Sequence, residues 1–325
     1  MTLSVDQFRE RAEKIETGVG KVIVGQSDVV RHVLVSILAG GHVLLEGVPG
    51  LGKTMLIRTL GEVLDLKFSR IQFTPDMMPA DILGTEILND QNGQREFRFR
   101  RGPLFANLVL ADEINRATPK TQSALLEAMQ ETSVTIAQQT YRLDEPFFVM
   151  ATQNPLEMEG TYPLPEAQLD RFFFKVNVNM PNAAEMVEIM DRTTGRDSPS
   201  TGKVVSGAEI IQMRALARGV PIASHVKEFV ARLALATHPE DSNGSPLVKK
   251  FVRYGVSPRG AQALTLGAKV TALLNGRFNV SFDDIKAVAP AALRHRLLLN
   301  FDGLAEGVKT DNVIDDLLSS LAISV

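Results

Sequence analysis

Cysteine is absent from the 325-residue sequence. This absence excludes disulfides, thiolate metal sites and thiol nucleophiles, and it fits the reducing environment of the cytoplasm. Long apolar runs are also lacking, since stretches such as residues 33–39 fall far short of the roughly 18 residues that span a bilayer. The N-terminus has no basic region followed by an apolar run, so no signal peptide is expected. We therefore expect a soluble cytoplasmic protein without a membrane span.

A strong charge imbalance is missing as well. The formal net charge of −3 does not indicate a protein that binds polyanions through its bulk charge. The five histidines are scattered, and none has the spacing of a metal-ligand pair on a helix. Hydrophobic residues make up 44% of the chain and charged residues 22%, which predicts a packed globular core. The length suits one large domain or two of ordinary size.

Short apolar strands alternate with helices in the first half of the chain. This order predicts a parallel sheet covered on both faces. Two hairpins are expected to interrupt it, one over residues 84–100 with a turn at 90–93, and one over residues 132–143. The predicted strands span residues 42–46, 68–73, 107–111, 147–152 and 172–178, and predicted helices at 53–64 and 119–130 lie between them.

The pattern changes after Pro181. Residues 183–194, 207–218, 224–238, 258–274 and 282–299 all predict helices, and no further strand is indicated. A stretch rich in Ser, Gly and Thr over residues 195–207 indicates a linker or loop. The sequence therefore predicts an α/β core with a five-stranded parallel sheet over residues 1–195, and a smaller all-helical domain over residues 196–325.

A phosphate-binding loop lies between the first predicted strand and the helix that follows it. Its glycines allow backbone N–H groups to surround phosphate oxygens at a helix N-terminus. Lys53 is suited to contact the β- and γ-phosphates, and Thr54 to hold Mg²⁺. The alternative is a glycine-rich turn with one exposed lysine. The residues expected at the nucleotide are Gly47, Val48, Pro49, Gly50, Leu51, Gly52, Lys53, Thr54 and Met55.

Two carboxylates follow the predicted strand at 107–111. The carboxyl ends of parallel strands are where ligands bind in open sheets. At this position Asp112 is expected to hold Mg²⁺, and Glu113 to polarise the attacking water as a general base. The alternative is that the pair caps a helix N-terminus, where acidic residues are common.

These motifs resemble those of AAA+ ATPases, and specifically of the MoxR family. The phosphate loop and the Asp112-Glu113 pair resemble Walker A and Walker B. The segments ADEINRA at 111–117, ATQNP at 151–155 and LPEAQLDRF at 164–172 resemble MoxR proteins in particular. The resemblance covers nearly the whole chain, from Val24 to the C-terminal helices, and the second domain would then be the AAA+ lid.

The resemblance implies roles for further residues. Asn154 matches the sensor 1 residue that orients the attacking water, although Asn also suits a turn before Pro155. Arg171 matches the arginine finger, whose permanent cation reaches the nucleotide of a neighbouring subunit. A surface ion pair of Arg171 with Asp170 or Glu166 is the alternative.

Arg259 matches the sensor 2 arginine at the start of a lid helix, where it is implied to touch the γ-phosphate and couple lid closure to the nucleotide state. An ordinary arginine at a helix start is the alternative. Val24, Gly25 and Gln26 match the region that lines the adenine site. Arg116 is a candidate for a contact across the subunit interface.

The two predicted hairpins match inserts that face the ring pore or a partner protein in this clade. Arg95, Arg98, Arg100 and Arg101 cluster on the first hairpin, as a contact surface for an acidic partner or nucleic acid, or as a solvated strand face.

The resemblance implies Mg²⁺-dependent ATP hydrolysis by a homo-oligomeric, hexameric ring, with ATP and Mg²⁺ as cofactors. That activity would drive chaperone-like remodelling, maturation or metal-cofactor insertion in client proteins, with partners that include von Willebrand factor A domains. Nucleic acid is not expected as a partner. Two alternatives stay open: a nucleic-acid motor, and a nucleotide-switched scaffold with little turnover.

Overall fold

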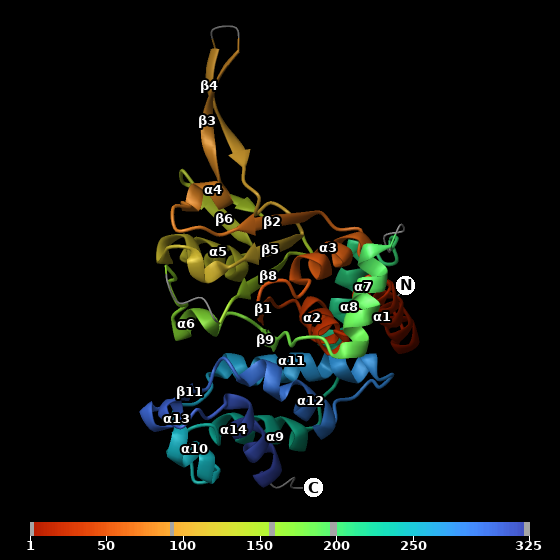
Figure 1. Cartoon of the computed structure of the whole chain (residues 1–325), viewed down its shortest axis with the longest axis vertical. Coiled ribbons are helices and arrows are strands. Elements are labelled where there is room, and N and C mark those ends of the chain that lie inside the picture. The colour runs from red at the N-terminus through yellow and green to blue at the C-terminus, as the bar shows by residue number, and fades with distance from the viewer. Residues whose placement is uncertain (1–2, 92–93, 156–159, 196–199, 322–325) are drawn as a thin grey trace.

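The computed structural model describes residues 3–91, 94–155, 160–195 and 200–321, and the side chains of residues 89–96 also lie outside the description. A sheet of five parallel strands in the order β2-β5-β8-β1-β9 forms the centre of the upper body (Figure 1). The predicted five-stranded parallel core is thus confirmed. Its strands are β1 (Val43–Glu46), β2 (Phe68–Gln72), β5 (Leu108–Asp112), β8 (Phe148–Gln153) and β9 (Phe174–Asn177).

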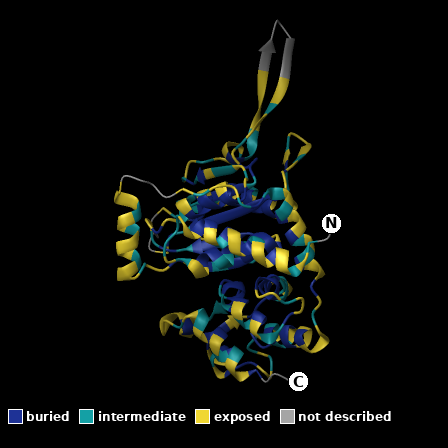
Figure 2. Ribbon diagram, turned by 90° about the vertical axis from the view of Figure 1, so that its right-hand side faces the viewer, coloured by how far each residue is buried: buried dark blue, intermediate teal, exposed yellow. Residues whose placement is uncertain are grey.

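Both faces of this sheet are buried, as the near-continuous apolar strands require. Successive side chains of a strand point to opposite faces, so Val43 and Leu45 join one hydrophobic core and Leu44 joins the other. Figure 2 shows the sheet as the most buried layer of the molecule. The first core includes residues from α1 (Val5–Gly20), α2 (Ser27–Ala39) and α3 (Lys53–Val63), and the second includes residues from α5 (Pro119–Glu131).

Two hairpins interrupt the α/β order, as predicted. The first, β3 (Gly84–Gln91) and β4 (Gln94–Arg101), follows the short α4 (Pro79–Leu83) and projects far from the body (Figure 1). The second consists of β6 (Ser133–Ile136) and β7 (Gln139–Arg142). Phe99 and Tyr141 stack with ring centroids 4.2 Å apart and join the two hairpins at their base. The predicted turn residues Asn92 and Gly93 lie outside the described residues.

The lid is helical, but it also holds a short antiparallel pair, β10 (Val252–Tyr254) with β11 (Leu298–Leu299). The prediction of no strand after Pro181 is therefore wrong, and the predicted helix at 282–299 ends at Leu293. Beyond that point Arg294 and Arg296 donate hydrogen bonds to backbone carbonyls of the core, at Lys175 and Phe173. The lid helices are α9 (Ser224–Leu235), α10 (Pro246–Phe251), α11 (Pro258–Leu274), α12 (Phe282–Leu293), α13 (Phe301–Ala305) and α14 (Thr310–Ser320).

Two helices lie between these bodies in sequence, α7 (Ala183–Thr194) and α8 (Gly207–Gly219). Helix α8 contacts α2 of the core as well as α11 of the lid. The division at residues 195 and 196 therefore remains a proposal, and part of the predicted linker, 196–199, lies outside the described residues. None of the helices within the described ranges is long and apolar enough to cross a membrane.

One buried histidine gives the fold a dependence on pH. The His42 ring, just before β1, accepts the Val149 N–H at Nδ1 over 3.0 Å and contacts the Met129 carbonyl through Nε2 over 3.0 Å. Burial is the main cause that lowers the pKa of His42 to about 4. Protonation would place a second N–H against the amide of Val149, so the folded protein holds this ring neutral.

Because the folded-state pKa of His42 is depressed, the unfolded chain binds a proton first as the pH falls. We expect the stability contribution of the neutral ring to be complete above pH 6.5 and lost progressively toward pH 4, up to about 3 kcal/mol. Urea unfolding at pH 7 and pH 4.5 measures it. In His42→Gln the loss should shrink without vanishing, because burial also lowers the pKa of His295. His225 is exposed, so His225→Gln is the control. If His42→Gln and His225→Gln lose the same free energy of unfolding between the two pH values, His42 is not the source of the pH dependence.

Candidate functional site

The phosphate loop joins β1 to α3 at the carboxyl end of the central sheet. Gly50 and Gly52 have φ angles of 85° and 75°, in the left-handed region that glycine adopts without strain. A Cβ atom on Gly47 would lie 2.8 Å from the carbonyl oxygen of Val178. The loop therefore needs glycine at these three positions, and it leads into the N-terminus of α3, where free N–H groups and the helix dipole favour an anion.

Asp112 is the last residue of β5 and faces the loop. Its Oδ1 accepts a hydrogen bond from Thr152 Oγ1 at 2.6 Å, and its Oδ2 accepts one from Arg70 Nη2 at 2.7 Å. The carboxylate is mostly buried, because 14% of its side chain is exposed. These contacts hold the carboxylate of Asp112 at the cavity that Thr54 also lines, where its oxygens can bind a metal ion.

Glu113 adopts a left-handed conformation, with φ of 57°, which is unusual for a residue with a side chain and typical of functional positions. Its N–H donates to Thr152 Oγ1 over 2.9 Å. Glu113 Oε2 accepts hydrogen bonds from Gln72 Nε2 at 2.8 Å and Arg116 Nη1 at 3.0 Å. Glu113 is the N-cap residue of the short helix η1 (Ile114–Arg116), but its side chain makes no capping hydrogen bond and points to Gln72 and Arg116 instead.

Lys53 and Asn154 complete this cavity. Lys53 Nζ donates to the Gly47 carbonyl over 2.5 Å. Burial lowers the pKa of Lys53, while the carboxylates of Asp112 and Glu113 oppose that shift, so the ammonium lies in a partly desolvated, acidic setting. Asn154 is buried just after β8. The cavity has a volume of about 230 Å³ and is lined by Pro49, Gly50, Leu51, Gly52, Lys53, Thr54, Arg70, Asp112, Glu113, Thr152 and Asn154.

The donor set of this cavity suits Mg²⁺ bound together with a nucleotide. Thr54 and Asp112 offer a hydroxyl and a carboxylate oxygen, which are hard ligands. Within the described ranges, no group of three or more His, Cys, Asp or Glu side chains forms a metal cage. Mg²⁺ commonly binds through one or two protein oxygens, with phosphates and water supplying the rest. Thr54 and Asp112 therefore fit the ion only in combination with phosphates.

A larger, mostly apolar cavity of about 520 Å³ adjoins the loop. Gln26 Nε2 donates to the Leu51 carbonyl over 2.8 Å and ties this cavity to the loop. Gly25 lies outside its lining and packs against Glu185. Such a cavity suits a flat base. Among its lining residues are Val24, Gln26, Pro49, Gly50, Leu51, Gly52, Met55, Met180, Met186 and Ile189.

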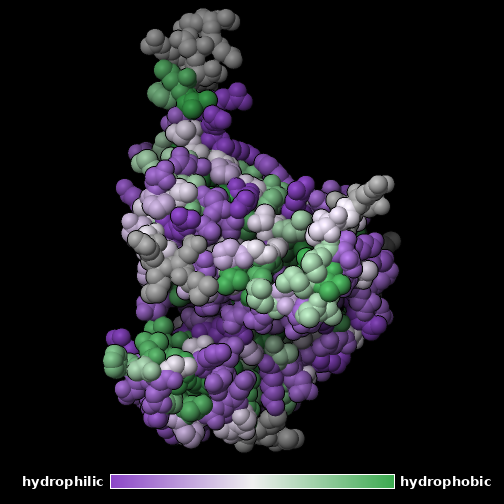
Figure 3. Space-filling view, viewed as in Figure 1, coloured by the Kyte–Doolittle hydropathy of each residue, from purple (hydrophilic) through white to green (hydrophobic). Residues whose placement is uncertain are grey.

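Helix α7 forms the outer wall of this cavity. Met186 and Ile189 line it, while Val187 and Met190 are exposed on the helix. Figure 3 shows a hydrophobic area over α7, and Figure 2 shows the helix set apart from the body. The base side of the candidate site is therefore bounded by a helix with no buried residue.

Arg171 and Arg259 lie together, but apart from the phosphate loop. Both line a third cavity, of about 250 Å³, with Asp170 and His42. His42 precedes β1 and Gly47 follows it, so the arginine cavity and the phosphate cavity adjoin opposite ends of this strand. At 3.3 Å per residue, the two ends are roughly 15 Å apart. The structure thus does not bring either arginine to the phosphate cavity of its own subunit.

Three residues of the site were not predicted to belong to it, although Thr152 lies in the ATQNP segment at 151–155. Arg70 and Gln72 lie within β2, and Thr152 lies within β8. Their side chains meet Asp112 and Glu113 only because β2 and β8 flank β5 in the sheet. Ligands bind outside the carboxyl ends of parallel strands, and this signal indicates Gln72 and Thr152, which lie at or next to the ends of β2 and β8. Of the partners considered for Arg171, Asp170 bonds Arg296 and Ser257 through its carboxylate.

Comparisons with known proteins identify the family of the chain. Residues 42–174 match the ATPase family associated with various cellular activities (AAA), and residues 245–317 match the AAA lid domain. The chain is 44% identical to Chaperone MoxR1 of Mycobacterium tuberculosis, over 94% of this chain and 80% of that one. It is 31% identical to protein MoxR of Paracoccus denitrificans, over 92% of each. The crystal structure of a candidate ATPase from Cytophaga hutchinsonii superposes with a TM-score of 0.92 at 42% identity, over 99% of this chain and 97% of that one.

Proposed function

Because the chain belongs to the MoxR family of AAA+ ATPases, we propose that it hydrolyses ATP with Mg²⁺ in a homo-oligomeric ring and thereby remodels client proteins. The observation that carries the proposal is the single cavity that gathers Lys53, Thr54, Asp112, Glu113 and Asn154. Lys53 and Thr54 begin α3, whereas Asp112 and Glu113 lie at the end of β5 and Asn154 follows β8, so their meeting is a property of the fold.

The proposed reaction is an in-line displacement at the γ-phosphorus. Glu113 takes a proton from the attacking water while the water oxygen bonds phosphorus and the bond to the β–γ bridging oxygen breaks. Lys53 binds the phosphates, and Asn154 orients the water. Thr54 and Asp112 would hold Mg²⁺, which would supply positive charge to offset that of the phosphates. The products are ADP and inorganic phosphate.

Arg171 and Arg259 are assigned to the nucleotide of the neighbouring subunit. Their cavity adjoins the opposite end of β1 from the phosphate loop, which supports action on a neighbour's phosphates rather than on those of the same subunit. An arginine supplied in trans stabilises charge in the transition state. Under this assignment catalysis requires assembly, and we propose a ring of six subunits.

The biological role is proposed from the relatives. The mycobacterial relative is named a chaperone, which supports protein clients here. Maturation or metal-cofactor insertion in such clients, and a partner with a von Willebrand factor A domain, belong to the same proposal, as does a cytoplasmic location. The boundary between a core over residues 1–195 and a lid over residues 196–325 is proposed with them.

The first test is the ATPase rate per subunit as a function of protein concentration. We expect the rate to rise with concentration and reach a plateau, because each site needs a neighbour. Lys53→Ala is the control: it should lose ATP binding and all hydrolysis, since the phosphates lose the half-buried cation that binds them. A rate independent of concentration far below assembly would contradict action in trans. Tight ATP binding by Lys53→Ala would contradict the loop assignment.

A nucleic-acid motor is the second candidate function, because the β3–β4 hairpin carries several arginines. In the β3–β4 register, Arg98 and Arg100 share one face, whereas Leu88 and Phe97 share the other and are exposed. Figure 3 shows this hydrophobic area below the undescribed tip. Arg101 instead lies over the Phe105 ring, 5.1 Å from its centroid. DNA binding that weakens steeply with salt would favour this candidate, and no binding at low salt would remove it.

A further inference from the structure

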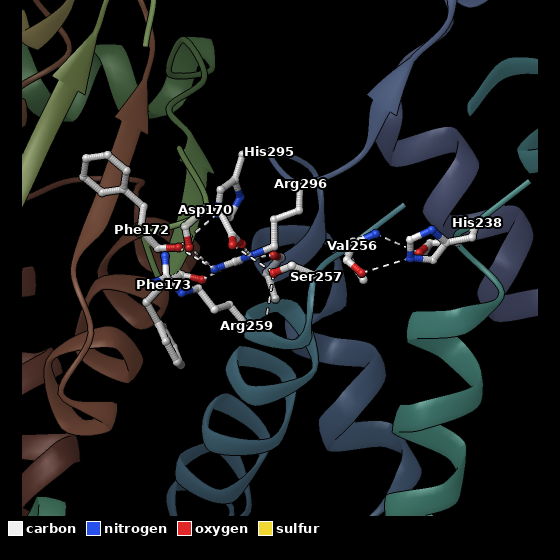
Figure 4. A network of polar contacts seen from close by, with 11 residues as sticks. Asp170, Phe172, Phe173, His238, Val256, Ser257, Arg259, His295 and Arg296 are labelled. Atoms are coloured by element: carbon white, nitrogen blue, oxygen red, sulfur yellow. Dashed lines mark hydrogen bonds and ion pairs between the residues drawn. The ribbon is translucent and has the colours of Figure 1, made fainter. Parts of the chain in front are cut away.

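One buried lid arginine holds the segment that carries Arg171. Arg296 follows α12, and 3% of its side chain is exposed. Its Nε donates to Asp170 Oδ1 over 2.8 Å. Its Nη2 donates to the carbonyls of Phe172 over 2.7 Å and Asp170 over 3.1 Å, and its Nη1 donates to the Phe173 carbonyl over 3.1 Å. Figure 4 shows the guanidinium among these groups. Arg296 therefore binds the backbone on both sides of Arg171.

The same network reaches the helix that carries Arg259. The second oxygen of Asp170, Oδ2, accepts a hydrogen bond from Ser257 Oγ at 2.8 Å. Ser257 is the N-cap of α11, and its Oγ accepts the N–H of Arg259 at 3.1 Å. One carboxylate thus bonds Arg296 through one oxygen and the start of α11 through the other (Figure 4).

This geometry is more specific than lid attachment requires. A planar guanidinium with several fixed donors sets the orientation of the groups that it binds, which a lysine ammonium cannot do. Arg294, two residues earlier, provides a comparison. It joins the lid to β9 through the Lys175 carbonyl at 3.1 Å and bonds Asp311 at 2.9 Å. In those two contacts Arg294 reaches β9 and α14, whereas Arg296 holds the segment that contains Arg171.

We propose that Arg296 and Asp170 are positioning residues that hold Arg171 and Arg259 in one arrangement, so that a subunit presents both arginines together to its neighbour's nucleotide. This inference rests on the proposed function. Because both arginines are tied to one carboxylate, a shift of the lid would move them jointly. The network thus connects the lid position of one subunit to hydrolysis in the next.

The test uses mixed assemblies. Arg296→Lys keeps a cation but loses the planar guanidinium with its several fixed donors. An assembly made only of this variant should have a kcat lower by about 10-fold or more, the range that small misplacements of catalytic groups produce. ATP affinity should change little, because the residue lies outside both nucleotide cavities. In mixed assemblies, a Glu113→Gln subunit presents intact arginines to the site of an Arg296→Lys neighbour. Activity should therefore rise well above that of either variant alone. In assemblies of Arg296→Lys with Arg171→Ala, activity should not rise, because both subunits then present defective arginines.

Controls separate positioning from folding. Asp170→Asn, which keeps the size of the side chain, should give the same pattern, and Arg294→Lys should keep near wild-type kcat. If Arg171→Ala recovers with Glu113→Gln but Arg296→Lys and Asp170→Asn do not, the network serves its own subunit and the positioning proposal is overturned. Recovery of Arg296→Lys with Arg171→Ala would also overturn it. If Arg171→Ala fails to recover with Glu113→Gln, action in trans fails, and the positioning proposal falls with it.

Discussion

Replacing Glu113 by glutamine is expected to abolish ATP hydrolysis while ATP remains bound. An amide has the size of the carboxylate and can still accept the hydrogen bonds from Gln72 and Arg116. It cannot take a proton from water, however, and removal of a general base lowers rates by roughly 10²- to 10⁴-fold. Steady-state phosphate release and binding of a fluorescent ATP analogue measure the two effects separately.

The matched control for this change is Glu62→Gln, on α3. Glu62 is exposed and pairs with Arg58 over 3.5 Å, and such surface pairs contribute little. This variant should turn over ATP at the wild-type rate. Turnover by Glu113→Gln within a few-fold of wild type would assign the general base to another residue. Normal ATP binding by a wild-type protein that shows no Glu113-dependent turnover would favour the nucleotide-switched scaffold.

Arg171→Ala is expected to bind ATP normally and hydrolyse it about 10³-fold more slowly, the lower range for loss of an arginine finger. Binding is retained because Arg171 lines neither nucleotide cavity of its own subunit. The transition state of the neighbouring site loses a permanent cation. Single-turnover kinetics at saturating ATP isolate the chemical step from binding.

Arg58→Ala removes an exposed arginine from the same core and should leave the rate unchanged. Assemblies that mix Arg171→Ala and Glu113→Gln subunits test the action in trans. An Arg171→Ala subunit keeps its own Lys53 and Glu113, so a Glu113→Gln neighbour should restore its site. Unchanged turnover by Arg171→Ala alone would show that Arg171 is not the finger.

Local sequence patterns determined the nucleotide-binding half of the site. A phosphate loop acts through consecutive backbone groups and a lysine, so Gly47, Gly50, Gly52 and Lys53 are recognisable without knowledge of the fold. Asp112 and Glu113 are recognisable for the same reason, because an apolar strand delivers them to the ligand edge. The five parallel strands and both hairpins followed from the same short-range periodicity.

Only the tertiary structure decided which distant side chains meet. Arg296 and Asp170 are 126 residues apart in the chain, and nothing near either predicts their bond. Arg70 and Gln72 contact the carboxylates only through the order of strands in the sheet.

The lid shows the same limit. Helical periodicity continues beyond Leu293, but the helix ends there, Arg294 and Arg296 bond the core, and β11 pairs with β10. Propensity acts over a few residues, and tertiary contacts override it where a buried charge must find its partners. The separation of Arg171 and Arg259 from the phosphate loop is likewise a property of the folded chain, because Arg171 lies at the opposite end of the sheet and Arg259 begins a lid helix that packs there.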